Sequence, residues 1–510
     1  MGSVTPDNDQ ATEPSTPRVA RRDVLVGTVG VALGAAAVGS GWALTSGGEP
    51  GPAPEPEAAP APPPAAPVRT FVSTSLTAPE VVPWRKAGAV LSAGLLLTTP
   101  RNPTFRAVIY DNDGEPVWIE PDGNAATELR VQRYRGRPVL TYWTGHIVEG
   151  LGYGKGVVLD ERYLPVAEVR AGNGLLVDLH EFQLTEEGTA LVLSYPVRQA
   201  DLSDVGGPVE GWVYGAQVQE IDVATGKVLF DWDGLEHIAV SETVREPEDG
   251  EGESEKKPFD PVHLNSVAAD GDALLLSARH TSAVYRIDRR SGEIRWRFGG
   301  KLSDIEVPAG GEFGWQHDAR RQPDGTITIY DNHEHAEKTD AVSAALKFEI
   351  DEQAMTATLV QALRYDDHYG YAMGNAQYLD DGHVLVGWGM DPVLTEFDEA
   401  GEPVFELRGL ALGSYRSYRS SWRGRPATPP DLAIGPDGRA YVSWNGATEV
   451  ARWRVLAGRR PDRLAEAATV DRAGFETAVP LDASAGVVRA EALDADGRVL
   501  GRTRVVTVGT

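Results

Sequence analysis

A recurring phrase, in which a tight turn precedes a short apolar strand, constrains the fold of this chain more than any other feature. The phrase reads DGDALLLSAR or DGTITIYDN, and it occurs at residues 186–195, 270–279, 324–332, 380–389 and 437–446. The glycine in each turn accepts the positive φ that tight hairpin turns require, and the apolar run is typical of a strand. A second phrase, a strand followed by an acidic turn and another strand, alternates with the first at residues 110–120, 221–232, 287–298 and 397–407.

The two phrases together give four short strands in a period of roughly 50 to 57 residues, with almost no helical periodicity. Repeated four-stranded antiparallel sheets are typical of a β-propeller, which closes radially and leaves few exposed edges. We therefore predict an all-β chain with a six-bladed β-propeller, seven blades being the alternative. The innermost strands are predicted to be LVLSY, LLLSA, TITIY, VLVGW and AYVSW.

The alternating strands at 474–508 have no matching partner phrase. They predict a small C-terminal β-sandwich-like module, completed by the early strands near TFVSTSLTAPEVV. An added outer strand of the last blade is the alternative. In this division the propeller is the catalytic domain and spans residues 70–464, and the small β module spans residues 465–510.

The N-terminus predicts export from the cytoplasm. Arg21 and Arg22 precede the weakly hydrophobic run VLVGTVGVALGAAAVGSGWAL, which is typical of a twin-arginine signal over residues 1–48. A membrane anchor is the alternative, because the run is just long enough to span a bilayer. Residues 49–69 are rich in proline and alanine and predict a semi-rigid linker. The protein is thus expected at the cell surface or secreted, with N-terminal membrane anchoring as the alternative to cleavage.

The overall charge and the lack of cysteine exclude several functions. A net charge of −27 disfavours nucleic acid and anionic membrane surfaces as partners. The sequence contains no cysteine, so disulfides, thiolate metal sites and cysteine nucleophiles are excluded. No feature indicates an oligomeric state.

Three histidines recur at one place relative to successive repeat units. They are His180, His263 and His317, and Arg279 closes the strand that follows His263. Because the inner strands of a propeller converge on a central channel, we expect these side chains to meet there. A repeat gives no packing reason to retain histidine, although structural capping of strand ends is the alternative. Three asparagines that flank the same strands are candidate substrate ligands: Asn265, Asn332 and Asn375.

Such a cluster suits the transfer of an anionic group. Imidazole is a nucleophile and a proton carrier near neutral pH, and further His and Arg side chains can bind the oxygens of the group in transfer. Trp315, Tyr369 and Tyr371 could line a pocket for a phenol, and packing between blades is the equal alternative. Asp331, His333 and His335 could form half of a metal site in an extended segment, but spacing fixes no third ligand, so no metal is predicted.

The blocks DLHEF, HLNSV…LLLSAR…GEIRWRFGG and QHDAR…DGTITIYDN resemble the arylsulfotransferase (arylsulfate sulfotransferase) family, as a divergent branch. The resemblance implies a six-bladed propeller that moves a sulfuryl group from an aryl sulfate donor to a phenolic acceptor. It implies a covalent sulfohistidine and no need for phosphoadenosine phosphosulfate or another cofactor. Periplasmic members carry a disulfide near the active site, which this cysteine-free chain lacks.

By motif, the resemblance assigns a role to each candidate. His317 matches the nucleophile, and His263 and Arg279 match the pair for sulfate binding and acid–base chemistry, with Asn265 beside them. His180 matches the histidine of the preceding block. The alternative function is a catalytically silent extracytoplasmic propeller that binds a cell-wall or extracellular ligand.

The paired arginines give a testable expectation for export. Changing Arg21 and Arg22 together to Lys should leave precursor in the cytoplasm, because the twin-arginine route recognises the pair. Fractionation of cells followed by immunoblotting measures the precursor. Unchanged export of the double variant through the general secretory route would contradict the assignment.

Overall fold

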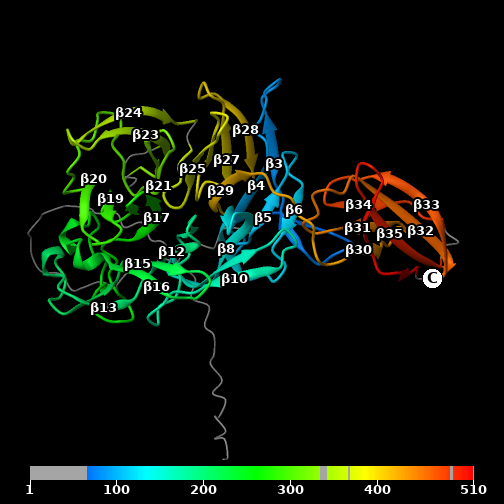
Figure 1. Ribbon diagram of the computed structural model, residues 1–510, viewed down its shortest axis with the longest axis horizontal. Helices are drawn as coiled ribbons and strands as arrows, with labels where there is room; N and C mark the ends of the chain where they lie inside the picture. The colour runs from blue at the N-terminus through cyan, green and yellow to red at the C-terminus, as the bar shows by residue number, and fades with distance from the viewer. Residues whose placement is uncertain (1–65, 334–341, 366–367, 483–485, 509–510) are drawn as a thin grey trace, which may run out of the picture. The chain divides into compact units, whose positions relative to one another are not determined.

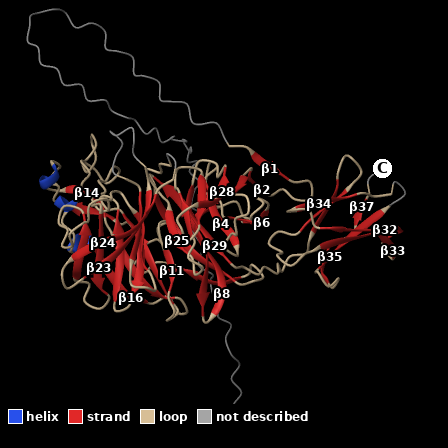
Figure 2. Ribbon diagram, turned by 90° about the horizontal axis from the view of Figure 1, so that it is seen from above, coloured by secondary structure: helices blue, strands red, loops and turns tan. Residues whose placement is uncertain are grey.

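The computed structural model describes residues 66–333, 342–365, 368–482 and 486–508. The predicted signal segment and most of the predicted linker lie outside these residues. The described part is built from strands, and its helices are three single 3₁₀ turns (Figure 2): η1 (Ser203–Val205), η2 (Gly234–Glu236) and η3 (Val240–Glu242). Among the described residues, no helix has the length and apolar character needed to cross a membrane.

Six sheets of the described chain share one antiparallel meander plan (Figure 1). From the first strand outwards, the first three are β7 (Ala125–Tyr134), β8 (Arg137–Val148), β9 (Leu151–Leu159), β10 (Pro165–Val169); β11 (Phe182–Leu184), β12 (Thr189–Ser194), β15 (Gln217–Asp222), β16 (Val228–Asp233); and β17 (Leu264–Asp270), β18 (Ala273–Ala278), β19 (Ala283–Asp288), β20 (Ile294–Gly299). A hairpin of β13 (Val197–Ala200) and β14 (Gly211–Tyr214) is inserted between β12 and β15.

The other three sheets complete the ring. They are β21 (His317–Arg321), β22 (Ile327–Asp331), β23 (Ala344–Asp351), β24 (Thr356–Leu363); β25 (Asn375–Tyr378), β26 (Val384–Gly387), β27 (Val393–Phe397), β28 (Pro403–Arg408), β3 (Val82–Arg85); and β29 (Ser414–Ser420), β4 (Leu95–Pro100), β5 (Val108–Tyr110), β6 (Pro116–Ile119). Sheets that follow one another contact in cyclic order, and the sheet of β29 contacts that of β7. The predicted all-β, propeller-type fold is confirmed.

Two strand pairings join the beginning of the described chain to its later part. β29 is the first strand of a sheet that β4, β5 and β6 complete, with Tyr418 opposite Leu97. β3 adds to the outer edge of β28, with Glu406 opposite Trp84. These pairings close the ring through main-chain hydrogen bonds between segments more than 300 residues apart in the sequence.

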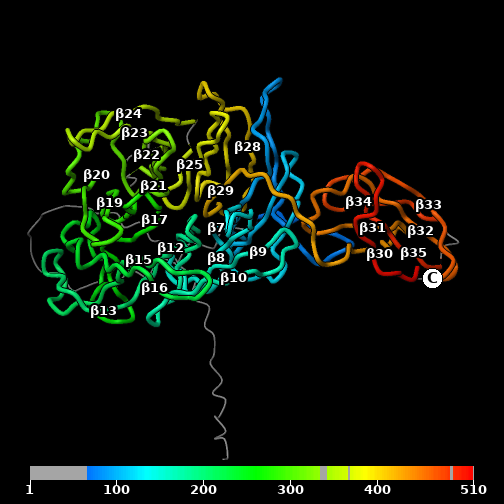
Figure 3. The backbone as a smooth tube through the Cα atoms, viewed as in Figure 1, coloured from blue at the N-terminus to red at the C-terminus, as the bar shows by residue number. Residues whose placement is uncertain are grey.

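The prediction of the innermost strands was wrong. The segments LVLS, LLLSA, ITIY and VLVG form β12, β18, β22 and β26, which are the second strands of their sheets. They are continuously apolar because neighbouring sheets cover both of their faces. The first strands, such as β21 and β29, lie nearest the common centre (Figure 3) and are polar, with sequences HDARR and SYRSYRS.

The C-terminal module begins earlier than the sequence-based boundary at residue 464. Its two sheets are β30 (Asp431–Ile434), β31 (Ala440–Ser443), β34 (Glu476–Val479), and β33 (Arg463–Asp471), β32 (Arg452–Arg460), β35 (Val487–Leu493), β36 (Val499–Arg502), with β37 (Val506–Thr507) on β35. The predicted fifth inner strand, AYVS, is β31 of this module. The repeat phrase misled the prediction because a turn before an apolar strand is shared by both architectures.

The early strands contribute a hairpin of their own to this region. β1 (Val68–Thr70), which begins inside the predicted linker, pairs only with β2 (Thr77–Pro79) among the described strands. The turn of the hairpin contacts the module, since Ser73 Oγ donates to Glu476 Oε1 at 2.6 Å and the Phe71 and Phe475 ring centroids lie 4.4 Å apart.

β-bulges interrupt four of the six first strands near the centre of the ring. They lie between Thr127 and Arg130 in β7, between Leu264 and Ser266 in β17, between His317 and Arg320 in β21, and between Ser414 and Ser417 in β29. A bulge leaves an extra residue unpaired and re-aims its side chain. The extra residues include Glu128 and Asp318, with φ of 58° and 56°, and Arg416.

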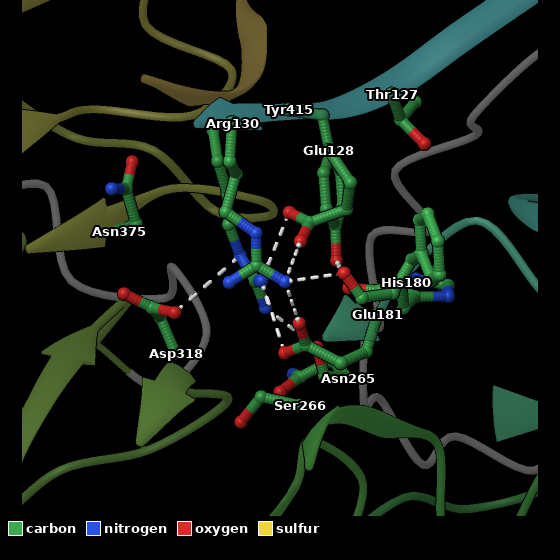
Figure 4. Close-up of polar contacts among 12 residues, drawn as sticks. Thr127, Glu128, Arg130, His180, Glu181, Asn265, Ser266, Asp318, Asn375 and Tyr415 are labelled. Atoms are coloured by element: carbon green, nitrogen blue, oxygen red, sulfur yellow. Dashed lines mark hydrogen bonds and ion pairs between the residues drawn. The ribbon is translucent and has the colours of Figure 1, made fainter. Parts of the chain in front are cut away.

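These bulges bring opposite charges together on the axis (Figure 4). The buried Arg416 donates from Nη1 to Glu128 Oε1 at 2.9 Å and to Glu181 Oε2 at 3.2 Å, and from Nη2 to the Asn265 carbonyl at 2.8 Å. Its Nε lies 3.6 Å from Asp318 Oδ1. Arg130 and Arg320 complete a set of three arginines and three carboxylates. Four first strands and the turn before β11 are thereby tied to one guanidinium.

Removal of this guanidinium should destabilise the whole ring. Arg416→Met leaves Glu128, Glu181 and Asp318 with one cation fewer in a buried position, and breaking a buried pair in this way costs about 3–5 kcal/mol. Urea denaturation followed by far-ultraviolet circular dichroism measures the loss. Arg460→Met, which removes an exposed arginine paired with Asp462, should stay within about 0.5 kcal/mol of wild type. A loss below about 1 kcal/mol for Arg416→Met would contradict the importance of the cluster.

Candidate active site

His317 is the first residue of β21 and is 2% exposed. Its Nδ1 lies 2.6 Å from Asn332 Oδ1, and its Nε2 accepts a 3.3 Å hydrogen bond from the Met373 N–H. An amide oxygen only accepts, so Nδ1 carries the proton and Nε2 carries the lone pair. Burial, and next the positive charge of Arg279, hold the pKa of His317 well below 6.5. His317 is therefore a neutral imidazole whose Nε2 is the nucleophilic atom.

The loop 368–374 covers this histidine from the neighbouring sheet. Asn332 Nδ2 donates to the carbonyls of Gly370, at 2.5 Å, and Met373, at 2.9 Å. The same asparagine thus fixes the tautomer of His317 through Oδ1 and the position of the Met373 N–H through Nδ2. Asn332 acts as a positioning residue, and both ends of its amide are used inside the site.

His180 and His263 face each other, each backed by a buried carboxylate. His180 Nδ1 lies 2.5 Å from Asp178 Oδ1, and His263 Nδ1 lies 2.6 Å from Asp260 Oδ2. The two ring centroids are 4.8 Å apart. A carboxylate at Nδ1 orients each ring, so that its Nε2 points away from the carboxylate. Burial lowers the pKa of His263 to about 3, against the opposing charge of Asp260.

Arg279 is a cation that no carboxylate of the described residues approaches within 4 Å. Its Nη1 donates to His280 Nε2 at 2.9 Å and its Nη2 to the Tyr371 carbonyl at 3.3 Å, while its guanidinium lies 3.7 Å from the Trp315 ring centroid. Its buried Nε has no partner in the described part of the chain. Burial lowers the pKa of Arg279 to about 9. A half-buried guanidinium without a carboxylate partner is suited to hold an anion.

The structure brings His180, His263, Arg279 and His317 into one region. The His263 ring centroid lies 4.8 Å from that of His180 and 4.6 Å from that of His280, which accepts from Arg279. Arg279 and His317 both contact the loop 368–374. Of the predicted asparagines, Asn332 belongs to the site and the other two join sheets. Asn265 Nδ2 donates to the Gln316 carbonyl at 2.7 Å, which fixes the residue before His317. Asn375 exchanges two 2.8 Å hydrogen bonds with the main chain of Ser417. The Asn375 amide is thus used between strands, and its assignment as a substrate ligand stays a prediction.

Several residues of the site were missed from the sequence. Asp178 and Asp260 precede their histidines by two and three residues, and this Asp–His spacing was the available signal. His280 accepts from Arg279 at Nε2, and its Nδ1 lies 2.7 Å from the Asp260 carbonyl. The Met373 N–H had no sequence signal, since any residue supplies a main-chain donor.

Asp260, His263 and His280 also have ligand-type atoms within 4.8 Å of one another. The Nδ1 atoms of both histidines face Asp260, and His280 Nε2 accepts from Arg279. We therefore describe the three as a hydrogen-bond network beside a cation. In the half-site considered from sequence, Asp331 Oδ1 accepts from the Gly314 and His333 N–H groups, and His335 lies outside the described residues.

His368 anchors the loop 368–374. Its Nδ1 lies 2.8 Å from Asp391 Oδ2, its Nε2 lies 4.0 Å from Glu406 Oε1, and its ring stacks on Trp388 with centroids 4.9 Å apart. Burial opposes the charged form, but the interactions with Asp391 and Glu406 raise the pKa of His368 to about 9. An imidazolium between two carboxylates thus holds the loop that carries Met373.

This anchor predicts a pH dependence of stability. Because the folded-state pKa is raised, the contribution of His368 is fully present below about pH 6.5 and is lost as the pH rises through about 9. The free energy of unfolding of wild type should fall over this range by more than that of His368→Gln, as measured by urea denaturation. Equal pH dependence in the two proteins would show that the imidazolium has no such role.

No curated protein matches the sequence. Solved structures with similar folds include a protein of unknown function from Bacteroides caccae (13% identity, 64% of this chain and 100% of that chain, TM-score 0.38) and the β-propeller domain of Cps50 (Swd1) from Myceliophteria thermophila (12%, 70% and 98%, 0.34). Neither similarity carries the chemistry of the neighbour to this chain.

The model of one protein family, Arylsulfotransferase (ASST), matches residues 130–409, which is more than half of the chain. The matched range contains His180, His263, Arg279 and His317, as well as the loop 368–374. It supports a sulfotransferase-type function with small-molecule substrates. The chain belongs to the arylsulfotransferase family.

Proposed function

We propose that the protein transfers a sulfuryl group from an aryl sulfate ester to a phenolic acceptor through a covalent intermediate on His317. The observation that carries this proposal is a neutral imidazole with an oriented Nε2, placed where the unpaired cation Arg279 lowers its pKa. The nucleophile and the anion-binding group contact the same loop, His317 through the Met373 N–H and Arg279 through the Tyr371 carbonyl. Family membership supports the same type of reaction.

In the first half-reaction, Nε2 of His317 attacks the sulfur of the donor. The N–S bond forms while the S–O bond to the aryl group breaks, and the electron pair leaves on the phenolate oxygen. Arg279 holds sulfuryl oxygens through its planar guanidinium. The Met373 N–H, which faces Nε2 at 3.3 Å, is a further donor placed near those oxygens. The phenolate leaves as an anion, with its charge stabilised by Arg279, and takes its proton from solvent, because burial keeps His263 neutral near neutral pH.

In the second half-reaction, the acceptor phenol attacks the sulfur. The neutral His263 has a lone pair on Nε2, since its Nδ1–H faces Asp260. It accepts the phenol proton as the new S–O bond forms and the N–S bond breaks, which returns His317 to its neutral form. Trp315 and Tyr371, which lie beside Arg279, are placed to contact the aromatic ring of donor or acceptor.

The low pKa of His317 sets the direction of the pH dependence. Protonation removes the lone pair of Nε2, so transfer falls as the pH drops through the pKa of His317. Because burial and the charge of Arg279 hold that pKa well below 6.5, this acid limb should lie below about pH 6.5.

The test is the intact mass of the protein after incubation with 4-nitrophenyl sulfate and no acceptor. Wild type should gain one sulfuryl group that maps to His317, and release of 4-nitrophenolate should show a burst. His317→Ala should give no adduct and lower transfer by at least about 10³-fold, the scale of losing a nucleophile. His146→Ala, a change of an exposed histidine on β8, is the matched control and should behave as wild type.

Two outcomes would count against the proposal. An adduct that persists in His317→Ala would place the nucleophile elsewhere. If no adduct forms and purified protein moves no sulfuryl group between phenols, the chain is a binding propeller whose histidines are structural.

A further inference from the structure

Two buried carboxylates, Asp178 and Asp260, contact the Nδ1 atoms of His180 and His263. Asp178 accepts from the Gly152 N–H at 2.6 Å and from the His180 N–H at 2.8 Å, in addition to its contact with His180 Nδ1. Asp260 accepts from the His263 N–H at 3.0 Å and contacts Nδ1 of the same residue. Although burial raises the pKa of Asp260, the charges and hydrogen bonds of His263 and His280 hold it well below 3.8.

These carboxylates limit the positive charge that the site can present. Arg279 contributes one charge, and each Asp–His pair contributes minus one when its histidine is neutral and zero when that histidine is protonated. The other titratable groups packed against the two rings are His280, Tyr195 and Tyr415. Burial raises the pKa of both tyrosines well above 10, and burial lowers the pKa of His280, so these groups add no charge near neutral pH.

We propose that Asp178 and Asp260 make the site selective for tetrahedral groups with a single negative charge, so that it accepts sulfate monoesters and rejects phosphate monoester dianions. This inference rests on the proposed function. The two ester groups have similar size and shape, so the donors around His317 do not by themselves distinguish them. A sulfate monoester carries one charge, whereas a phosphate monoester carries nearly two at pH 7, because its second pKa is about 6.

The charge balance explains the discrimination. Burial keeps His263 neutral near neutral pH, so the Asp260–His263 pair presents one negative charge, and Arg279 is the cation available to an entering anion. A dianion would bring one more negative charge than a monoanion into a site that already contains two buried carboxylates, and a further charge without a matching cation is unfavourable there. The two aspartates are therefore specificity-determining residues that also orient the rings.

The test compares binding of 4-nitrophenyl sulfate and 4-nitrophenyl phosphate by isothermal titration calorimetry on the full chain, at about pH 8 and about pH 5. At the higher pH the phosphate ester should bind at least about tenfold more weakly than the sulfate ester, the scale of one like charge nearby. At the lower pH, where the phosphate ester is a monoanion, the ratio should approach one. The ratio cancels any change in histidine protonation that affects both ligands equally.

Variants then assign the effect to the aspartates. Asp260→Asn and Asp178→Asn each remove one negative charge at nearly constant shape and should shift the ratio at about pH 8 toward the phosphate ester by about tenfold. Asp272→Asn makes the same charge change at an exposed turn, where the Asp272 side chain is 77% exposed, and should leave the ratio unchanged. Thermal unfolding verifies that each variant is folded. If Asp260→Asn does not fold, the ratio measured with Asp178→Asn decides the test.

The results separate this inference from the proposed function. If sulfuryl transfer occurs but the ratio of the two ester affinities changes neither with pH nor with the two substitutions, the charge selectivity is overturned and the proposed transferase function still holds. Equal binding of the two esters by wild type at about pH 8 would do the same. If neither ester binds and no sulfuryl adduct forms, the proposed function and this inference fail together.

Discussion

The buried guanidinium of Arg416 is the interaction on which the rest of the ring depends. Alone, such a charge would be strongly unfavourable in the interior, so it requires the carboxylates of Glu128, Glu181 and Asp318 around it. Each of these acids belongs to a different sheet, and two of them reach the axis only because a bulge turns them there. The electrostatic requirement of one side chain thus fixes the relative position of sheets that share no main-chain hydrogen bonds.

The strands that carry the Arg416 cluster also position the histidines of the candidate site. His317 is the first residue of β21, immediately before the bulge that directs Asp318 to the axis. Tyr415, which precedes Arg416 in β29, donates from its hydroxyl to the His180 carbonyl at 3.0 Å. His317 thus lies on a strand of the axial cluster, and His180 and His263 lie just before the first strands of their sheets, β11 and β17. The buried ion pairs around Arg416 fix the sheets that carry the histidines. The histidines are therefore preorganised even though they do not themselves contact every sheet.

The sequence was sufficient for the fold class, and it singled out four residues that the fold brings into one region, because turn glycines and recurrent histidines are local signals: His180, His263, Arg279 and His317. The sequence did not reveal the order of the strands in each sheet. An apolar segment such as LLLSA is buried between neighbouring sheets as a second strand, whereas the first strands at the centre of the ring are polar. The prediction also misplaced the β31 segment, whose turn and apolar run are common to both sheet architectures. The role of Asn375 depends on Ser417, 42 residues away in the chain, and no local pattern reports such a partner.

The Arg279 guanidinium in the candidate site lowers the stability of the fold. Arg279 is half-buried with no carboxylate within 4 Å among the described residues, and its buried Nε has no hydrogen-bond partner there, so part of the cost of removing the guanidinium from water is not compensated. Such a group destabilises an empty site, and substitution of Arg279 by an apolar residue would by this reasoning relieve the strain. An entering anion supplies the missing charge and hydrogen bonds. Anion binding thus relieves the desolvation penalty of Arg279, which adds to the affinity for the group in transfer. The stability that the Arg416 cluster gives to the ring offsets this penalty in the empty site.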